Sequence, residues 1–396
     1  MGFRPAVYKL ANELGLSGFI LNDTKGVTIE LQGLEKSISE FLDRLQSIDK
    51  PPLAEIRSCK TTDIPSIKDE NSFRIEHSDS TGTALSEVSA DMALCQDCLR
   101  EMQNPGDFRY RYPFINCTNC GPRYSIIKTI PYDRPNTTMA VFEMCRRCSG
   151  QYQDVTDRRF HAQPVACGKC GPEIFLTDSK ANTIETNLDS VIAETVRLLK
   201  QGKIAAIKGI GGFHLAVDAL KDKDVQRLRR RKRRDHKPFA MMSDSVEKIK
   251  RYAIVDESAE NLLKSPQSPI VLLPKKPDSA IAPSVAEGVD TFGFMLCYAP
   301  LHYLLFAQGL EVLVMTSGNI SDEPLICDNE KATERLGDIA DIFLMHNRDI
   351  YRQVDDSIVH IIDDRPVLLR RARGYVPMPV TFAQSCPVDI FAAGLI

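Results

Sequence analysis

The residues with the clearest chemical pattern are eight of the twelve cysteines, which form four Cys-x-x-Cys pairs. Such a turn directs two sulfurs towards one point, and two turns complete a tetrahedron of thiolates around a zinc ion. The last two pairs repeat the first two 50 residues later, and each copy reads C-x2-C-x18-C-x2-C, a zinc-ribbon spacing. Four sulfurs leave no open position for water, so we expect two structural zinc ions. The expected ligands are Cys95, Cys98, Cys117, Cys120, Cys145, Cys148, Cys167 and Cys170.

The duplication extends beyond the cysteines. Asp107 and Arg109 recur as Asp157 and Arg159, and Cys-Gly-Pro closes both copies. Redox dithiols or disulfides are the alternative interpretation of these pairs, but redox chemistry gives no reason for a duplicated spacing. The repeat therefore favours two zinc ribbons.

A second candidate site lies near the N-terminus. Arg4 precedes a helical pattern, and an arginine at a helix N-terminus combines its donors with free amides and the helix dipole to suit a phosphate. Asn22 lies 18 residues later at a strand-end turn, where its amide could hold an attacking water. A surface arginine and a turn asparagine are the plainer interpretation of the same two residues.

A basic segment forms a third candidate, because eight of the eleven residues 227–237 are Lys or Arg. It could be a solvated helix, a nucleic-acid patch or a triphosphate site. The last interpretation places Lys232, Arg234 and Lys237 just before an apolar strand, where their charge would stabilise a departing pyrophosphate.

Further polar residues follow apolar segments in the C-terminal half. Thr316, Ser317 and Asn319 follow one strand pattern, and small hydroxyls beside a glycine let backbone amides approach a phosphate or carbonyl closely. The segment 208–214 is rich in glycine and predicts a strand-to-helix turn close to a ligand, without dinucleotide-binding spacing. Arg348, Arg370 and Arg371 lie in later polar clusters, each of which could equally be surface or turn.

The elements that must position these residues follow from hydrophobic periodicity. Residues 1–58 predict a helix over 4–14, strands over 17–21 and 26–31, and a second helix over 34–48. From residue 185 apolar strands alternate with helices, which indicates an α/β domain. The expected strands there are 204–208, 239–242, 270–273, 312–316, 342–345 and 357–362.

Composition limits the class of protein. Hydrophobic residues make up 43% and charged residues 26%, which is typical of globular chains. A net charge of −3 excludes a general polyanion binder, so any phosphate or nucleic-acid site must come from local clustering. The apolar stretch 292–307 is too short to span a membrane and the N-terminus has no signal-peptide core, so we expect a cytoplasmic protein.

Two motifs in the first 30 residues resemble the acylphosphatases. They are Gly-Phe-Arg-Pro and the hairpin Asn-Asp-Thr-Lys-Gly-Val-Thr-Ile-Glu. In that family the matching arginine binds the acyl phosphate and the matching asparagine orients the water. The resemblance therefore implies a ferredoxin-like domain in which Arg4 and Asn22 are catalytic.

The C-terminal motifs resemble the YrdC fold. They are Lys-x-Arg-x-x-Lys-Pro, Ser-Pro-Ile-Val, Thr-Ser-Gly-Asn, His-Asn-Arg-Asp and Arg-Arg-Ala-Arg-Gly, in that order. An acylphosphatase-like domain, two zinc ribbons and a YrdC-like twisted α/β domain together resemble the HypF carbamoyltransferases of nickel–iron hydrogenase maturation. The resemblance implies a nucleotide site formed by Lys232, Arg234, Lys237, Thr316, Ser317, Asn319, Arg348, Arg370 and Arg371.

The implied activity is a relay between two sites. The first domain hydrolyses carbamoyl phosphate to carbamate, and the YrdC-like domain uses ATP with Mg²⁺ to form carbamoyl-adenylate. The family then transfers the carbamoyl group to the C-terminal cysteine of HypE, its protein partner. That step uses a large C-terminal domain, so we expect this chain alone not to complete it.

The resemblance also implies domain boundaries across a multidomain chain of α/β and α+β parts. The first domain is expected to lack the family's first strand, and the last segment to be the start of a truncated C-terminal domain. The expected ranges are 1–58 for the acylphosphatase-like domain, 59–91 for a linker, 92–141 and 142–184 for the ribbons, 185–380 for the YrdC-like domain and 381–396 for the final segment.

Two other functions stay open. One is a zinc-ribbon module that binds RNA through the basic segment. The other is a threonylcarbamoyl-adenylate synthase for tRNA, against which the acylphosphatase-like domain argues because that chemistry starts from bicarbonate.

Overall fold

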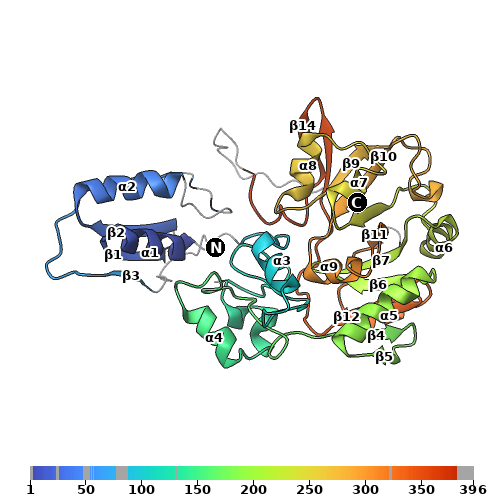
Figure 1. Cartoon of the computed structure of the whole chain (residues 1–396), viewed down its shortest axis with the longest axis horizontal. Helices are drawn as coiled ribbons and strands as arrows, with labels where there is room; N and C mark the ends of the chain where they lie inside the picture. Colours follow the sequence, from blue (N-terminus) through green and yellow to red (C-terminus); the bar gives the residue numbers. More distant parts are fainter. Residues whose placement is uncertain are drawn as a thin grey trace, which may run out of the picture.

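The computed structural model describes residues 3–380, apart from 24–25, 48–53, 55, 57, 77–87, 131 and 321–322. Figure 1 shows a small domain on the left, a region around two short helices in the centre and a large sheet domain on the right. The segment 381–396, expected to open a further domain, lies outside the described residues. Among the residues that are described, no helix has the length and apolar character needed to cross a membrane.

The small domain is a three-stranded sheet covered by two helices. Its elements are α1 (Phe3–Glu13), β1 (Ser17–Asp23), β2 (Gly26–Gln32), α2 (Glu35–Gln46) and β3 (Phe73–Ile75), with strand order β2-β1-β3. The apolar residues expected on one face of α1, Val7 and Leu10 among them, are buried with Ile20 and Phe41. The four elements predicted over residues 1–58 are therefore confirmed.

The boundary of this domain differs from the expected one. β3 pairs in parallel with β1, although residues 59–91 were expected to be a linker. A strand of three residues with polar neighbours carries no readable periodicity, and only its pairing with β1 and the burial of Phe73 define it.

The central region contains the duplicated cysteine segments. The N-terminal caps of α3 (Gln96–Gln103) and α4 (Arg146–Gln153) are Cys95 and Cys145, so each first Cys-x-x-Cys pair lies on a helix start. Two short 3-10 helices, η1 (Arg134–Asn136) and η2 (Thr138–Val141), connect the copies.

The large domain is built on an eleven-stranded sheet in the described chain, with the order β14-β13-β9-β10-β8-β11-β7-β6-β12-β4-β5. The strands are β4 (Ile174–Asp178), β5 (Thr183–Glu185), β6 (Ala205–Lys208), β7 (Phe213–Asp218), β8 (Ala240–Ser243), β9 (Ile270–Pro274), β10 (Thr291–Leu296), β11 (Leu313–Ser317), β12 (Ile342–His346), β13 (Ile358–Ile362) and β14 (Arg365–Arg370). The helices are α5 (Leu188–Lys200), α6 (Asp222–Lys232), α7 (Val246–Ile249), α8 (Glu257–Lys264), α9 (Pro300–Phe306) and α10 (Asn329–Leu336), with the 3-10 helix η3 (Pro283–Val285). All six strands expected from apolar runs are present.

Alternate residues of the central strands belong to two separate cores, as the period of two in a strand requires. Ala205 and Ile207 of β6 pack in one core and Ala206 in the other. The first core also contains residues of α5, α9 and the cysteine region, such as Phe114. The two cysteine segments, the expected ribbons, are called the first and second finger below. They therefore cover one face of the sheet and contribute to its hydrophobic core.

Two expectations about this domain are corrected. The segment 208–214 was expected to lead from a strand into a helix, but it joins β6 to the antiparallel strand β7. The turn needs its glycines, because a Cβ atom on Gly211 would lie 2.2 Å from the carbonyl oxygen of Val354. β4 and β5, expected within the second ribbon (142–184), instead extend the large sheet beyond β12, because β4 supplies apolar residues to its core.

Candidate metal centres and nucleotide site

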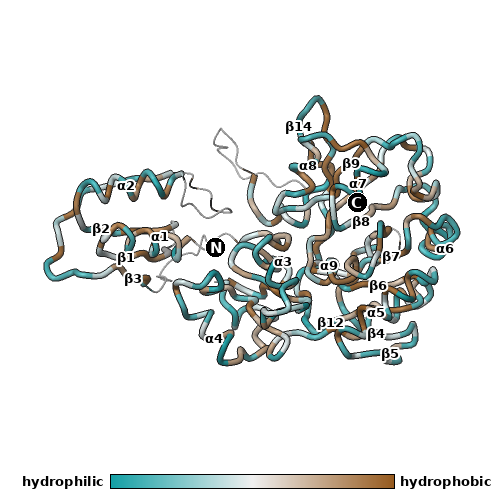
Figure 2. Tube along the Cα trace, viewed as in Figure 1, coloured by the Kyte–Doolittle hydropathy of each residue, from teal (hydrophilic) through white to brown (hydrophobic). Residues whose placement is uncertain are grey.

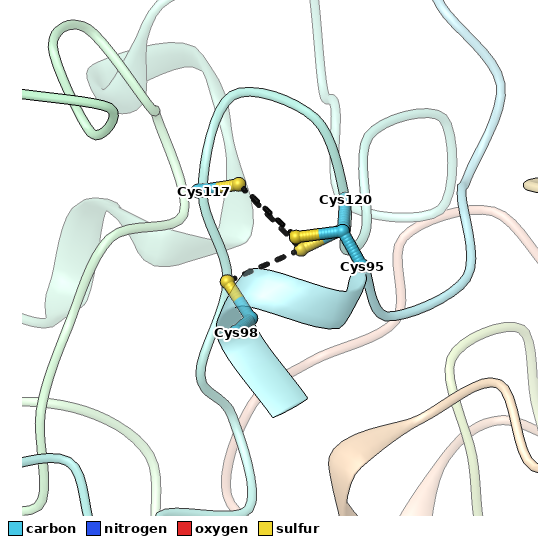
Figure 3. A group of neighbouring side chains, drawn as sticks. All are labelled: Cys95, Cys98, Cys117 and Cys120. Atoms are coloured by element: carbon cyan, nitrogen blue, oxygen red, sulfur yellow. Dashed lines mark hydrogen bonds between the residues drawn. The ribbon is translucent and has the colours of Figure 1, made fainter. Parts of the chain in front are cut away.

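The first two cysteine pairs converge on one point. Figure 3 shows Cys95 and Cys98 at α3 facing Cys117 and Cys120 on a neighbouring turn. The Sγ atoms of Cys95 and Cys117 are 3.7 Å apart, those of Cys117 and Cys120 3.9 Å, and those of Cys120 and Cys98 3.6 Å. A tetrahedron with zinc–sulfur bonds of about 2.3 Å has edges of about 3.8 Å. This cluster therefore has the dimensions of a four-thiolate zinc site.

The second set of cysteines forms a matching cluster. The Sγ atom of Cys167 lies 3.8 Å from that of Cys145 and 3.8 Å from that of Cys170. With Cys148 they make the second four-sulfur group, so the eight predicted ligands meet in the predicted two groups of four. Both groups fit zinc, and four sulfur ligands would hold each ion without an open position for a substrate.

Arginines link the two fingers reciprocally. Arg109 of the first finger donates to the sulfur of Cys148 at 3.4 Å and to the carbonyl oxygen of Ala166 at 2.8 Å. Arg158 of the second finger donates twice to the sulfur of Cys98, at 3.2 Å each. Each finger thus neutralises charge at the other's sulfurs. The repeat did not indicate this, because Arg159, the counterpart of Arg109, donates to the carbonyl oxygen of Asn116 and to Glu101 instead.

The predicted nucleotide residues Lys232, Ser317 and Asn319 meet at one end of the sheet. Lys232, the last residue of α6, is fully buried and its Nζ donates to the carbonyl oxygen of Ser317 at 2.8 Å and to Oδ1 of Asn319 at 2.7 Å. The Ser317 hydroxyl donates to the same Oδ1 atom at 2.8 Å. Burial lowers the pKa of Lys232 to about 7, with a smaller contribution from Arg234.

Other predicted residues lie around this group. Arg234 donates to the carbonyl oxygens of Lys237 and Pro238 at 3.1 and 2.8 Å, which folds the segment after α6 onto itself. Lys237 is exposed, whereas Thr316 is buried within β11. The nucleotide role of these residues stays a prediction.

The three remaining arginines occupy different surroundings. Arg370 lies 3.5 Å from Asp355, a carboxylate whose charge also acts on Lys232. Arg371 donates to the carbonyl oxygen of Tyr375 at 3.2 Å. Arg348 is buried with its guanidinium 5.1 Å from the ring centre of Phe114 in the first finger. Lys232, Ser317 and Asn319 are called the Lys232 group below. Arg370 is linked to this group through Asp355, whereas Arg348 lies at the interface with the fingers.

Lys208, at the end of β6, is a candidate residue that sequence reasoning missed. Its Nζ donates to Oδ1 of Asn329 at 2.8 Å, and burial lowers its pKa to about 8. β6 and β12 are parallel, and β11 runs the same way because β7 is antiparallel to both β6 and β11. Lys208, Ser317 and His346 therefore end their strands at one edge of the sheet. The lysine just before the glycine turn was the available signal.

In the first domain, Arg4 lies in the first turn of α1, as expected. It is partly buried; burial lowers its pKa, which the nearby Asp133 and Tyr152 of the finger region raise. On the same helix Lys9 donates to the carbonyl oxygen of Thr156 at 2.7 Å. The backbone of Asn22 pairs with Val27 in the β1–β2 hairpin. The helix carrying the predicted phosphate residue thus packs towards the second finger.

The basic helix α6 is not an open cationic face, although Figure 2 shows it as strongly hydrophilic. Arg229 is largely buried and donates to the carbonyl oxygen of Ser284 at 2.6 Å. Arg231 forms an ion pair with Asp341 at 2.8 Å, and Lys232 points inward. These three cationic side chains are therefore buried or paired within the domain, which weakens the interpretation of α6 as a nucleic-acid patch.

Comparison with known families matches the parts of this architecture in order. The acylphosphatase family matches residues 1–75, the HypF finger family matches 94–127 and 144–177, and the family described as telomere recombination (Sua5, YciO and YrdC) matches 197–372. A carbamoyltransferase HypF of Synechocystis is 45% identical over 394 residues, which is all of this chain and 51% of the relative. The chain is a homologue of the HypF carbamoyltransferases.

Other HypF proteins give the same result. A probable carbamoyltransferase HypF of Methanocaldococcus jannaschii is 46% identical, with 96% of this chain and 49% of the relative covered. A crystal structure of full-length HypF in a phosphate- and nucleotide-bound form superposes with a TM-score of 0.88 at 49% identity, covering 96% of this chain and 49% of that one. The HypF of T. kodakarensis gives 0.85 at 42% identity, over 96% and 48% of the two chains. The chain spans about half the length of the curated relatives it matches.

Proposed function

We propose that this chain carries out the first two steps of HypF carbamoyl transfer in hydrogenase maturation. Carbamoyl phosphate and water give carbamate and phosphate in the first domain. Carbamate and ATP then give carbamoyl-adenylate and pyrophosphate in the YrdC-like domain. The observation that carries the proposal is the match to HypF carbamoyltransferases along the whole chain, with the Lys232 group at the sheet edge where the nucleotide is expected.

In the first step Arg4 would hold the phosphate. Its position in the first turn of α1 adds the positive end of the helix dipole to the guanidinium fork. Asn22 would orient the water, as the resemblance to acylphosphatases implies. Carbamate decomposes in water, so a second site within the same chain favours its capture.

In the second step a carbamate oxygen attacks the α-phosphorus of ATP, and the bond to the β,γ-pyrophosphate breaks. Negative charge then grows on the departing oxygens, and Lys232 with Arg234 would stabilise it. Ser317 and Asn319 hold the Lys232 ammonium in place through the hydrogen bonds described above. Mg²⁺ bound with ATP would neutralise further phosphate charge.

ATP–pyrophosphate exchange tests the second step. Lys232→Met is expected to lower the exchange rate at least 100-fold, because it removes a positive charge placed to stabilise the departing pyrophosphate. Lys223→Met is the matched control, since Lys223 is exposed on the same helix. Equal exchange in the two variants would exclude Lys232 from the reaction.

Release of phosphate from carbamoyl phosphate tests the first step. Arg4→Gln is expected to abolish it while leaving pyrophosphate exchange supported by added carbamate intact. Lys9→Gln, a change on the same helix at the contact with Thr156, is the control for the packing of α1. Loss of both activities in Arg4→Gln would mean that Arg4 is structural.

We further propose that the carbamoyl-adenylate formed here supplies the later transfer of the carbamoyl group to HypE, a step outside the two assigned to this chain. Of the two alternatives, RNA binding is disfavoured because Arg229 and Lys232 of the basic segment are buried. A threonylcarbamoyl-adenylate synthase is disfavoured because the whole-length relatives are carbamoyltransferases and an acylphosphatase domain is present.

A further inference from the structure

Arg348 is a buried cation that forms no ion pair within the described residues. Only 4% of the residue is exposed, its Nε atom has no hydrogen-bond partner, and no carboxylate of the described residues forms an ion pair with it. Its guanidinium contacts the Phe114 ring, and Tyr112, Asp91 and Tyr132 lie near enough to favour its charge without forming an ion pair. An unpaired buried charge is costly to folding, so its retention suggests an anionic ligand.

Arg348 lines a small cavity between the first finger and the sheet domain. The cavity measures about 30 Å³, and a buried water needs about 10–15 Å³ on the same measure. It thus has room for a ligand of a few non-hydrogen atoms and none for a nucleotide. Its polar walls are Lys208, Tyr298, His302, His346 and Arg348, and its apolar walls include Leu94, Phe114 and Ile210.

The two histidines are neutral and offer opposite hydrogen-bonding groups. Burial lowers the pKa of His302 to about 3 and that of His346 well below its ordinary value. His346 Nε2 faces the carbonyl oxygen of Gly209 at 3.3 Å; with the proton on Nε2, its Nδ1 is an acceptor, and the ring also lies near the backbone of Arg348. His302 Nδ1 accepts from the amide of Ala299 at 3.4 Å, so its unpartnered Nε2 is a donor.

We propose that this cavity binds a small planar monoanion that carries both oxygen acceptors and a hydrogen-bond donor, namely carbamate or bicarbonate. Arg348 pairs with the two oxygens, His302 donates to one of them, and His346 accepts from the N–H or O–H group. His346 and Ser317 end their strands at the same end of the sheet, with β6 and β7 between them, so the anion would be held at this end beside Lys208 and two strands away from the strand of Ser317. The choice of carbamate as the physiological ligand rests on the proposed function. The existence of an anion site rests only on the residues that line the cavity.

Thermal unfolding of the whole zinc-loaded chain tests the site without any enzyme assay. Bicarbonate, or bicarbonate with ammonium, which generates carbamate, is added against chloride at equal ionic strength. At tenfold Kd the wild type is expected to gain about 3–6 °C in Tm, Arg348→Gln none and Arg348→Lys an intermediate amount. The exposed Arg365→Gln on β14 is the charge-matched control and should respond as the wild type does.

The same experiment separates a binding role from a structural one. Without added anion, Arg348→Gln should melt no lower than the wild type, because it removes an unpaired buried charge. A lower Tm for that variant, or equal stabilisation of wild type and variant by bicarbonate, would overturn the proposal. A larger shift with ammonium than without it identifies carbamate as the better ligand, and the reverse identifies bicarbonate.

Kinetics distinguish failure of this site from failure of the proposed function. In pyrophosphate exchange, Arg348→Gln should raise KM for carbamate at least tenfold and change KM for ATP less than twofold. Equal rises in both KM values would contradict a separate anion site. If the wild type shows no exchange, the proposed function fails, and the unfolding measurement still decides whether the cavity binds the anion.

Discussion

The two fingers share one spacing but neutralise their sulfurs differently. At the first cluster the donor is Arg158, whose charge is shared with Glu101 through an ion pair at 2.6 Å. At the second cluster the donor is Arg109, which is 1% exposed, and its Nη1 atom has no hydrogen-bond partner in the described residues. Residue 151, the equivalent of Glu101, is glutamine.

The difference indicates that duplication fixed the metal ligands while the surrounding charges diverged. In the first finger a carboxylate holds the arginines of its neighbour, and in the second the arginine is held by burial and by the Phe108 ring 4.1 Å away. Because each arginine comes from the opposite finger, the pair should fold and bind zinc as one unit. The predictions below test that comparison.

The largest effect is expected from removing a thiolate. Structural zinc contributes about 10–16 kcal/mol in small zinc-finger peptides, so Cys98→Ser and Cys148→Ser should each lose the ion of the altered cluster. Because the arginines cross between fingers, the other ion should also be weakened, and zinc content should fall from two per chain to below one. Zinc analysis of purified protein measures this.

Cys59→Ser is the control, since that cysteine is exposed and outside both clusters. It should leave the zinc content unchanged. One full zinc ion retained in Cys98→Ser would show that the fingers are independent and would contradict the claim that they bind zinc as one unit.

The two crossing arginines should differ in effect. Arg109→Ala leaves the carbonyl oxygen of Ala166 and the Cys148 sulfur without a buried donor. We expect this to lower the free energy of unfolding by about 3 kcal/mol. Arg158→Ala should cost about 1–2 kcal/mol, because that side chain is 26% exposed and Glu101 keeps its contact with Arg159. Urea unfolding and the rate of zinc release to a chelator measure both. The opposite order would mean that burial matters less here than the ion pair.

Glu101→Gln makes the first finger resemble the second at this position. The loss of a partly buried ion pair with Arg158 and Arg159 should cost about 1–2 kcal/mol and speed zinc release from the first cluster. Urea unfolding and the chelator assay measure the two effects, with Glu143→Gln, a change at an exposed residue, as the control. No change in either quantity would show that the carboxylate is incidental to the first cluster.

Arg147→Ala should have the smallest effect. The guanidinium of Arg147 lies 3.6 Å from the ring centre of Phe108 and is exposed, where such contacts are worth about 0.5–1 kcal/mol. Its counterpart in the first finger is Asp97, which pairs with Arg100 instead. A cost above that of Arg109→Ala, measured in the same urea series, would mean that Phe108 is held mainly from outside.

The parts of this structure that could be predicted from sequence are those encoded by local pattern. Cysteine spacing fixes the ligands because four thiolates must reach one ion. Apolar runs identified strands such as β6 and β12 because these are buried on both faces. The helix of Arg4 followed from its periodicity in the same way. These signals need no knowledge of distant contacts.

The missed features depend on contacts far apart in the chain. β3 forms by pairing with the edge of β1. The glycine turn after Lys208 leads into a strand because β7 pairs with β11, which lies about 100 residues later in the chain. The crossing of Arg109 and Arg158 and the burial of Arg348 without an ion pair depend on how the two fingers and the sheet pack together. Neither spacing nor composition carries that information.

The central claim is that one chain both releases carbamate from carbamoyl phosphate and adenylates it. The most direct measurement is ATP–pyrophosphate exchange by the zinc-loaded wild type with no carbamate source, with carbamoyl phosphate, and with ammonium bicarbonate. The account predicts no exchange without a source and exchange with both sources. Exchange with neither source would contradict the adenylation site, and exchange with ammonium bicarbonate alone would contradict the hydrolytic role of the first domain.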